Sequence, residues 1–336
     1  MRLAALFVAS FSFSVATQTN AQDSYFTDND PEIVRYQVET DIPYGQGKVL
    51  RDGKKDVLEL TMDIYYPLKQ IGSPRPAIIL VYGGAHHRGN PRVRYVGFGS
   101  QTTSMSEYAM RFAEEGIVAF TIRYRVAPDN PVVGPYEGFT EDDLETDFLL
   151  DPAAISQANI IRDQMGLEPL TSETSAPVLK SAIIAGAEDL RAAVRQVKRS
   201  SEEFGIDPDR IALMGFSAGA VTAINVAFGM QERVAAVIAN SGYPSVFNME
   251  KLVTAESDVP PVLIFMAQND YAVVEMELPP FIEHLSRIGA EYSFNWVPSH
   301  GHFYPSGTTS LGSDGSRMSV EARAIRFLNE VFEDRE

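Results

Sequence analysis

The sequence of 336 residues contains no cysteine, and this absence removes several kinds of chemistry. A chain without cysteine forms no disulfide, binds no metal through thiolates, and has no cysteine nucleophile or cysteine-linked lipid. Long apolar runs are also missing, so the sequence predicts no membrane-spanning helix. With 45% hydrophobic and 22% charged residues, the chain can instead bury a large core in one big domain or two modest ones.

Basic residues are scarce as well. The 28 lysines and arginines face 45 acidic residues, which gives a net charge of −17. This charge repels phosphate backbones and anionic lipid surfaces, so we expect no nucleic acid partner. The histidine pair His86–His87 has no accompanying histidine–carboxylate cluster with ligand spacing. The sequence therefore predicts neither a metal site nor a cofactor.

The first residues have the order of a secretory signal peptide. In MRLAALFVASFSFSVATQTNAQD, Arg2 precedes a short apolar run, and small residues then offer cleavage after Ala21 or, less favourably, Ala16. The apolar run is too short for a membrane span. We expect residues 1–21 to be removed and the mature domain, residues 22–336, to be secreted or periplasmic.

Short apolar runs alternate with helix-like segments along the rest of the chain. This alternation predicts an α/β fold with a mostly parallel central sheet and helices on both faces. The expected strands are Leu58–Tyr65, Ala77–Tyr82, Ile117–Tyr124, Ile211–Met214, Val234–Ala239, Val262–Ala267 and Tyr292–Val297. The expected helices are Ser104–Glu115, Val178–Lys198, Ala218–Phe228, Pro280–Ile288 and Ser319–Phe332.

One segment interrupts this alternation. From Asp129 to Ala176 the chain is rich in proline and acidic residues, including EDDLETD at Glu141–Asp147. We interpret residues 129–176 as an insertion with some helix near Ala153–Gln164. Such a long insertion forms either a cap over a functional site or a solvated acidic loop, and both interpretations stay open.

The stretch ALMGFSAGAV places Ser217 between Gly215 and Gly219, where a predicted strand meets a predicted helix. A sharp turn there needs glycine on both sides of the serine and lifts its hydroxyl clear of the sheet. The amide of Ala218 and the positive end of the following helix then face the same point. The sequence therefore predicts a serine nucleophile, with Ala218 as one oxyanion donor.

A serine needs a base and a group that orients the base. His300 and His302, in VPSHGHFYP, follow the last predicted strand and are both candidate bases. Asp270 ends the apolar strand PPVLIFMAQND and should emerge at the same sheet edge as Ser217, whereas Asp258 precedes that strand and should lie at the opposite edge. Asp270 also fits the chain order serine, acid, histidine.

A second oxyanion donor is expected in the loop after an early strand. The segment ILVYGGAHHRG at Ile79–Gly89 offers Gly83 and Gly84 directly after apolar residues. Glycine there permits close approach of the backbone to a reacting oxygen. By itself such a loop is more often a simple turn.

Taken together, these segments resemble the α/β-hydrolase superfamily, in its carboxylesterase, hormone-sensitive-lipase-like and bacterial feruloyl or acetyl-xylan esterase-like branches. The resemblance covers about Pro43 to Phe332. It is carried by LTMDIYYP (LDVYxP in the family), RPAIILVYGGAHHRG (the strand and HGGG loop), FTIRYRVAP (YRLAP), AGAEDLRAAVRQV (D-x-x-A-A), FGIDPDRIALMGFSAGA (the nucleophile segment) and VPSHGHFYP (GAGHFYP). The last likeness places the base at His302.

Two departures modify this resemblance. Tyr82 stands at the position of the HGGG histidine and Ala85 at that of its third glycine, which assigns the loop's oxyanion amides to Gly84 and Ala85. The chain is also much longer between Pro128 and Asp189 than in the simplest family members, which is the insertion again.

The resemblance implies a serine hydrolase that cleaves carboxylic esters through an acyl-enzyme, with Ser217, His302 and Asp270 as its triad. A prolyl-oligopeptidase-like peptidase and a non-catalytic binding protein on the same scaffold are the alternatives, although the chain has no room for a propeller and retains every triad residue. The expected substrate is a small-molecule or carbohydrate-linked ester; a lipid-like ester, a lactone and a polyester monomer fit the pattern equally. The sequence carries no signal for an oligomeric state.

Overall fold

The computed structural model describes residues 35–68, 74–333 and 335, and a ten-stranded sheet organises these residues. The predicted signal peptide, residues 1–21, lies outside the described residues. In spatial order the sheet consists of β1 (Tyr36–Arg51), β2 (Lys54–Pro67), β6 (Val118–Ile122), β3 (Arg75–Val81), β7 (Ile206–Phe216), β8 (Ala236–Asn240), β9 (Val262–Asn269), β10 (Tyr292–Gly301), β11 (Thr309–Gly312) and β12 (Arg317–Ser319). A separate hairpin pairs β4 (Val96–Gly97) with β5 (Ser100–Gln101).

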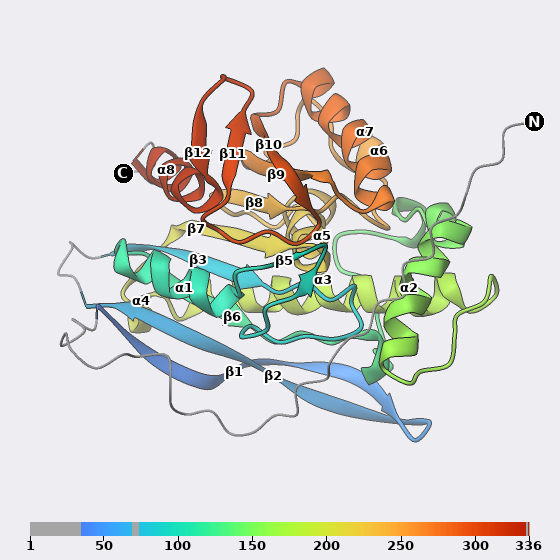
Figure 1. Cartoon of the computed structure of the whole chain (residues 1–336). Coiled ribbons are helices and arrows are strands. Elements are labelled where there is room, and N and C mark those ends of the chain that lie inside the picture. The colour runs from blue at the N-terminus through green and yellow to red at the C-terminus, as the bar shows by residue number, and fades with distance from the viewer. Residues whose placement is uncertain (1–34, 69–73, 334, 336) are drawn as a thin grey trace, which may run out of the picture. The chain divides into compact units, whose positions relative to one another are not determined.

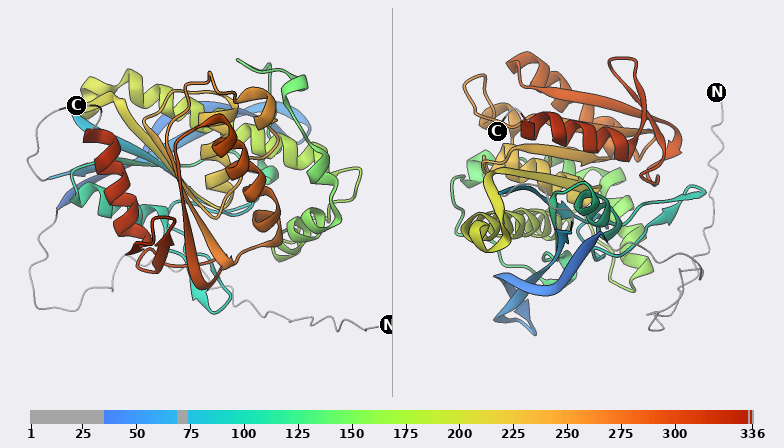
Figure 2. Two further views of the ribbon diagram at one scale, coloured as in Figure 1. Left: turned by 90° about the horizontal axis from the view of Figure 1, so that it is seen from above. Right: turned by 90° about the vertical axis from the view of Figure 1, so that its left-hand side faces the viewer.

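The six central strands, from β6 to β10 in spatial order, are parallel, and the strands at both edges are antiparallel. This arrangement confirms the predicted mostly parallel sheet. All residues of β6 and β8 are buried, because helices cover both faces. The helices are α1 (Met105–Glu114), α2 (Pro152–Gln164), α3 (Ser175–Arg199), α4 (Ser201–Phe204), α5 (Ala218–Ile224), α6 (Met249–Leu252), α7 (Ala272–Ile288) and α8 (Val320–Glu333). Figures 1 and 2 show α1 and α8 on one face and α3, α5 and α7 on the other. None of these helices, in the part of the chain that the structure describes, is long and apolar enough to cross a membrane.

Each strand and helix predicted from the sequence overlaps an element of the structure, but the start of one helix was wrong. The predicted helix at Pro280–Ile288 begins eight residues earlier, at Ala272, and two prolines lie inside it. Its buried face, which includes Val274, Leu278 and Phe281, packs on the core. The free energy gained by this packing exceeds the cost of the backbone hydrogen bonds that the prolines cannot donate. The helix predicted at Ala218–Phe228 is helical throughout, because α5 is continued by a π-helical turn at Asn225–Gly229.

The insertion, residues 129–176, contains α2 where the sequence predicts helix, and short 3₁₀ turns before it. Its acidic run lies along α3 and α6. Glu141 forms an ion pair with Lys180 of α3, and Asp143 forms one with Lys251 of α6. Two of the five carboxylates are therefore neutralised by lysines of the main fold.

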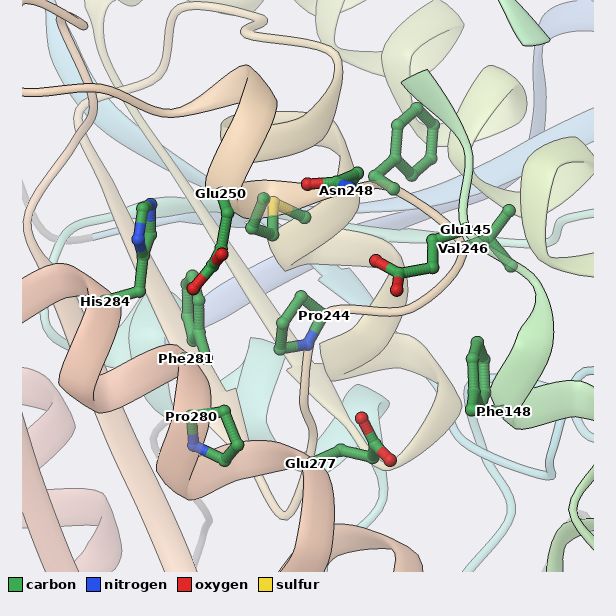
Figure 3. Close-up of a pocket in the computed structure, with 12 residues that line it drawn as sticks. Glu145, Phe148, Pro244, Val246, Asn248, Glu250, Glu277, Pro280, Phe281 and His284 are labelled. Carbon is green, nitrogen blue, oxygen red and sulfur yellow. The ribbon is translucent and has the colours of Figure 1, made fainter. Parts of the chain in front are cut away.

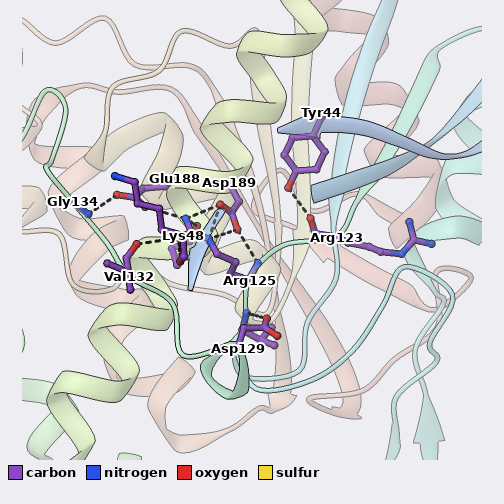
Figure 4. A network of polar contacts seen from close by, with 11 residues as sticks. Tyr44, Lys48, Arg123, Arg125, Asp129, Val132, Gly134, Glu188 and Asp189 are labelled. Atoms are coloured by element: carbon purple, nitrogen blue, oxygen red, sulfur yellow. Dashed lines mark hydrogen bonds and ion pairs between the residues drawn. The ribbon is translucent and has the colours of Figure 1, made fainter. Parts of the chain in front are cut away.

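A buried arginine fixes the start of the insertion to the sheet (Figure 4). Arg125 follows β6, and its guanidinium donates to Asp189 of α3 at 2.7 and 3.0 Å. The same guanidinium donates to the carbonyl oxygens of Lys48 in β1 and Val132 in the insertion. Arg125 therefore joins β1, β6, α3 and the insertion at one point.

Candidate active site

Ser217 occupies a strained turn between β7 and α5. Its φ and ψ angles are 54° and −122°, outside the regions that ordinary residues adopt. A Cβ atom on Gly215 would lie 2.1 Å from the Gly219 backbone, and one on Gly219 would lie 2.0 Å from the Val81 carbonyl oxygen. Both glycines of the motif are therefore required by close backbone packing, and the turn directs Ser217 away from the sheet.

The structure brings Ser217, His302 and Asp270 together although 85 and 32 residues of sequence separate them. His302 Nε2 lies 2.8 Å from Ser217 Oγ, and His302 Nδ1 lies 2.5 Å from Asp270 Oδ1. A carboxylate only accepts hydrogen bonds, so Nδ1 carries a proton and Nε2 is left to accept the serine proton. His302 and Asp270 are both buried, which protects this chain of hydrogen bonds from water.

Asp270 has further donors that fix its carboxylate. Oδ2 accepts hydrogen bonds from the Ser241 hydroxyl at 2.7 Å and the Ala267 amide at 3.1 Å, and Oδ1 accepts one from the Tyr271 amide at 2.8 Å. Burial raises the pKa of Asp270, but His302 and these donors lower it more, so the pKa lies below its usual value. Asp270 is therefore a carboxylate at neutral pH.

The other acidic and histidine candidates lie elsewhere. His300 Nδ1 bonds with the Pro298 carbonyl oxygen at 2.9 Å, and this ring does not line the cavity at Ser217. Asp258 is exposed and lies 3.6 Å from Arg233. His284 of α7 donates from Nε2 to the Val253 carbonyl oxygen at 2.8 Å. Of these candidates, His302 contacts Ser217 directly, and Asp270 is connected to Ser217 through His302.

Ser217 opens into a cavity of about 70 Å³. Apolar side chains of α3, α5 and α7 line it, namely Ile183, Val221 and Val274. Gln157 of α2 lines the same cavity. A residue of the insertion therefore faces the candidate nucleophile.

The loop between β3 and the β4–β5 hairpin supplies the other wall of this cavity. Ala85 of this loop and Ala218 of α5 line the cavity. Within residues 35–68, 74–333 and 335, neither of their amides has a hydrogen-bond acceptor. Gly84 does not line the cavity, and its carbonyl oxygen accepts the amides of His87 and Arg88, but its own amide has no hydrogen-bond acceptor among the described residues either. The amides of Ala85 and Ala218 are therefore available at the cavity wall, and that of Gly84 stays a predicted donor next to Ala85.

His86 and His87, for which the sequence analysis predicts no role, hold this loop. Ala85 and His86 have φ angles of 55° and 57°, a costly conformation for residues other than glycine. His86 Nε2 lies 3.1 Å from the Thr222 hydroxyl, and His87 Nδ1 donates to the Ala85 carbonyl oxygen at 2.8 Å. Burial, with a smaller effect of His87, lowers the pKa of His86 to about 3, so its ring is neutral. No group of three or more potential metal-ligating side chains occurs among the described residues.

Aromatic rings surround His302. Tyr271 lies 4.2 Å from the imidazole between ring centres, Phe216 5.1 Å and Phe303 5.2 Å. Each of these residues adjoins a member of the candidate triad in sequence, because Tyr271 follows Asp270, Phe216 precedes Ser217 and Phe303 follows His302. Their positions in the sequence could have predicted that these rings lie near the site. They could not have predicted that the rings contact the imidazole.

Pro244 and Val246 line a second cavity, of about 230 Å³ (Figure 3). Glu145 of the insertion, Glu250 of α6 and Glu277 of α7 line it, and none of the candidate triad residues does. Burial and the nearby carboxylates of Glu145 and Asp151 raise the pKa of Glu277. The acidic run of the insertion therefore contributes Glu145 to this second cavity. The residue of the insertion that lines the cavity at Ser217 is Gln157.

The fold of the chain is similar to that of several solved hydrolases. A truncated carbohydrate esterase from gut microbiota matches with 16% identity and a TM-score of 0.54, over 89% of this chain and 98% of that one. Esterase B from Lactobacillus Rhamnosis matches with 16% identity and a TM-score of 0.53, over 92% and 89% of the two chains. MGS-M1, an α/β hydrolase enzyme from a Medee basin deep-sea metagenome library, matches with 17% identity and a TM-score of 0.52, over 89% and 99%. These likenesses establish the α/β-hydrolase fold.

Family membership rests on the sequence itself. No curated protein was found to match the chain. The model of the dienelactone hydrolase family, however, matches residues 97–332, which hold Ser217, Asp270 and His302. Since this match spans well over half of the sequence, the chain belongs to the dienelactone hydrolase family and is a hydrolase of carboxylic esters.

Proposed function

We propose that the protein cleaves carboxylic esters through an acyl-enzyme formed on Ser217. The observation that carries this proposal is the continuous set of hydrogen bonds from Ser217 through His302 to Asp270, at 2.8 and 2.5 Å. A serine hydroxyl is a weak nucleophile at neutral pH and becomes reactive when an oriented base removes its proton. The strained turn at Ser217 and the buried carboxylate of Asp270 support the same assignment.

In the first half of the reaction, Ser217 Oγ attacks the ester carbonyl carbon while His302 Nε2 takes the hydroxyl proton. Asp270 holds the imidazole in position and stabilises its charged form. The carbonyl oxygen becomes an oxyanion, which the amides of Ala218 and Ala85 bind. The C–O bond to the alcohol then breaks, and His302 returns the proton to the departing alkoxide.

Water completes the cycle by the same groups. His302 removes a proton from a water molecule, whose oxygen attacks the acyl carbon, and the same two amides hold the second oxyanion. The bond to Ser217 Oγ breaks as His302 returns the proton to it. The products are a carboxylic acid, an alcohol and the free enzyme, so the atoms balance without a co-reactant.

We further propose that the acyl group is short. The cavity of about 70 Å³ is small compared with typical ligand pockets, which measure roughly 300–1,000 Å³. Ile183, Val221 and Gln157 enclose it from three helices. An acetyl or propionyl group fits such a cavity better than a long alkyl chain does.

Export is also part of the proposal. The order of Arg2, an apolar run and small residues before Ala21 supports cleavage of a signal peptide and a secreted or periplasmic location. The absence of cysteine is compatible with such a location, because a domain with a large core needs no disulfides there.

The direct test measures hydrolysis of p-nitrophenyl acetate, butyrate and octanoate by purified wild type, Ser217→Ala and His302→Ala. Both variants should lose at least about 10³-fold in kcat, and acetate should be the best substrate. His300→Ala is the matched control, since its ring lies off the cavity, and it should keep most of the turnover. Full activity of the purified Ser217→Ala variant would refute the mechanism.

A further inference from the structure

The hairpin of β4 and β5 carries an exposed aromatic residue at its tip. Phe98 and Gly99 form its two-residue loop, and both have positive φ, 53° and 71°. Asparagine, aspartate and glycine are the usual residues in such a loop, because a bulky side chain is strained there. Phe98 is nevertheless 51% exposed, so burial alone does not explain a large apolar side chain at this position.

Close packing holds this hairpin against the loop that carries His302. A Cβ atom on Gly97 would lie 2.5 Å from the ring of Phe303, and one on Gly301 would lie 2.7 Å from the ring of Phe98. Each glycine therefore lets an aromatic ring of the other segment approach its backbone. Both views in Figure 2 show the hairpin beside the end of β10.

The rings of Phe98, Tyr271 and Phe303, here named the Phe98 platform, lead outward from His302. Tyr271 lies 4.2 Å from the imidazole and 5.6 Å from Phe98 between ring centres, and Phe303 lies 6.0 Å from Phe98. Tyr271 also lines the cavity at Ser217. An apolar aromatic surface therefore extends from the candidate base to the exposed tip of the hairpin.

The chemistry decides which part of the ester meets this surface. His302 Nε2 gives its proton to the departing alcohol, so the alcohol oxygen must lie within hydrogen-bond reach of His302. The acyl group occupies the small cavity at Ser217, bounded by Ile183 and Val221. The rest of the alcohol extends past Tyr271 toward Phe98.

We propose that the Phe98 platform binds the alcohol part of the substrate and that this part is a six-membered ring with a face that stacks on an aromatic side chain, a pyranose sugar or a phenol. The inference rests on the proposed ester hydrolysis and names its substrate class. A half-exposed phenylalanine offers a flat face, on which such a ring stacks through its C–H groups or its π face. Strain of this kind persists at functional positions, where the side chain has a task that a turn residue does not perform.

The test compares the KM and kcat of wild type and Phe98→Ala on three acetate esters: ethyl acetate, phenyl acetate and a monoacetylated methyl xylopyranoside. Phe98→Ala should raise KM for at least one of the two ring esters by roughly five- to tenfold, with kcat within about twofold. KM for ethyl acetate should not change. The ring ester whose KM rises identifies the natural alcohol as a sugar or a phenol, and Phe98→Tyr should restore the wild-type value.

Two further variants separate recognition from structure. Val96→Ala is the matched control, because Val96 is 58% exposed on the same hairpin and belongs to neither the cavity nor the platform. It should leave all three KM values unchanged. Phe98→Asn relieves the positive φ, so this variant should keep or raise the melting temperature while KM for the ring ester still rises.

The inference fails if Phe98→Ala changes KM for ethyl acetate as much as for the ring esters, or changes none of them. In either case wild-type turnover of the acetates leaves the proposed ester hydrolysis intact. If wild type hydrolyses none of the three esters, the proposed function itself fails, and the inference with it.

Discussion

His86 shows how a single residue supports the candidate site without touching the reacting atoms. The Thr222 hydroxyl donates to the Ala218 carbonyl oxygen at 2.8 Å, so it accepts the hydrogen bond from His86 Nε2. The carbonyl oxygen of His86 in turn accepts the Ala127 amide at 2.7 Å. His86 thus ties the loop of Ala85 to α5, which begins directly after Ser217.

The depressed pKa of His86 predicts a loss of stability in acid. In the unfolded chain the imidazole binds a proton below about pH 6.5, whereas in the folded chain its pKa is about 3. Stability is therefore lost as pH falls through 6.5, by about 2 kcal/mol from His86 alone between pH 7.5 and 5. Urea unfolding at these two pH values measures this change. In His86→Asn, where asparagine tolerates the positive φ, the difference in the free energy of unfolding between pH 7.5 and 5 should be about 2 kcal/mol smaller than in wild type. An unchanged pH dependence would contradict a neutral, buried His86.

At the scale of single residues, the sequence was sufficient to predict which residues end strands. It was not sufficient to predict contacts between segments that lie far apart in the chain. Ser217 and Asp270 follow apolar runs, and parallel strands bring their carboxyl ends to one edge, so their proximity was predictable. Gly84 was predicted as an oxyanion donor together with Ala85, but only Ala85 lines the cavity. The roles of His86 and Phe98 depend on contacts with Thr222 and Tyr271, which no local pattern reveals.

At the scale of elements, the buried Arg125–Asp189 pair joins β1, α3 and the insertion. Breaking a buried pair leaves an uncompensated charge, so Asp189→Asn should destabilise the protein by about 3–5 kcal/mol. Equilibrium urea unfolding measures the loss. Glu188→Gln is the control, because Glu188 bonds with the same guanidinium but its side chain is more exposed, and it should cost about 1 kcal/mol or less. Equal losses in the two variants would show that burial of the pair is not the cause.

The central strands were easier to predict than those at the edges. β3, β7, β8 and β9 are buried on both faces and read as short apolar runs. β1 was missed, because its sequence YQVETDIPYGQGKVLR is mostly exposed and contains two register shifts, and it is a strand through its pairing with β2. β11 and β12 are too short and too polar to give a periodic signal.

For the whole molecule, the order of apolar runs and helix-like segments predicted the class of fold, and the segments that resemble the α/β-hydrolase superfamily predicted the chemistry. A largely parallel sheet follows from the alternation of apolar runs and helices, and the structure confirms it. The course of the insertion did not follow from its acidic composition. Lys180 and Lys251 fix its acidic run, whereas Gln157 of α2 reaches the cavity at Ser217. The insertion thus contributes a side chain to the cavity at Ser217, beside those of α3, α5 and α7.

The most direct test of the central claim is to find which residue a fluorophosphonate modifies. Purified protein is treated with one equivalent of the reagent, and intact mass and peptide mapping locate the adduct while residual ester hydrolysis is measured. The account predicts one phosphonyl group on Ser217, loss of activity in proportion to labelling, and no adduct on Ser217→Ala. Inactivation with the label on another residue, or full turnover by protein labelled at Ser217, would contradict it.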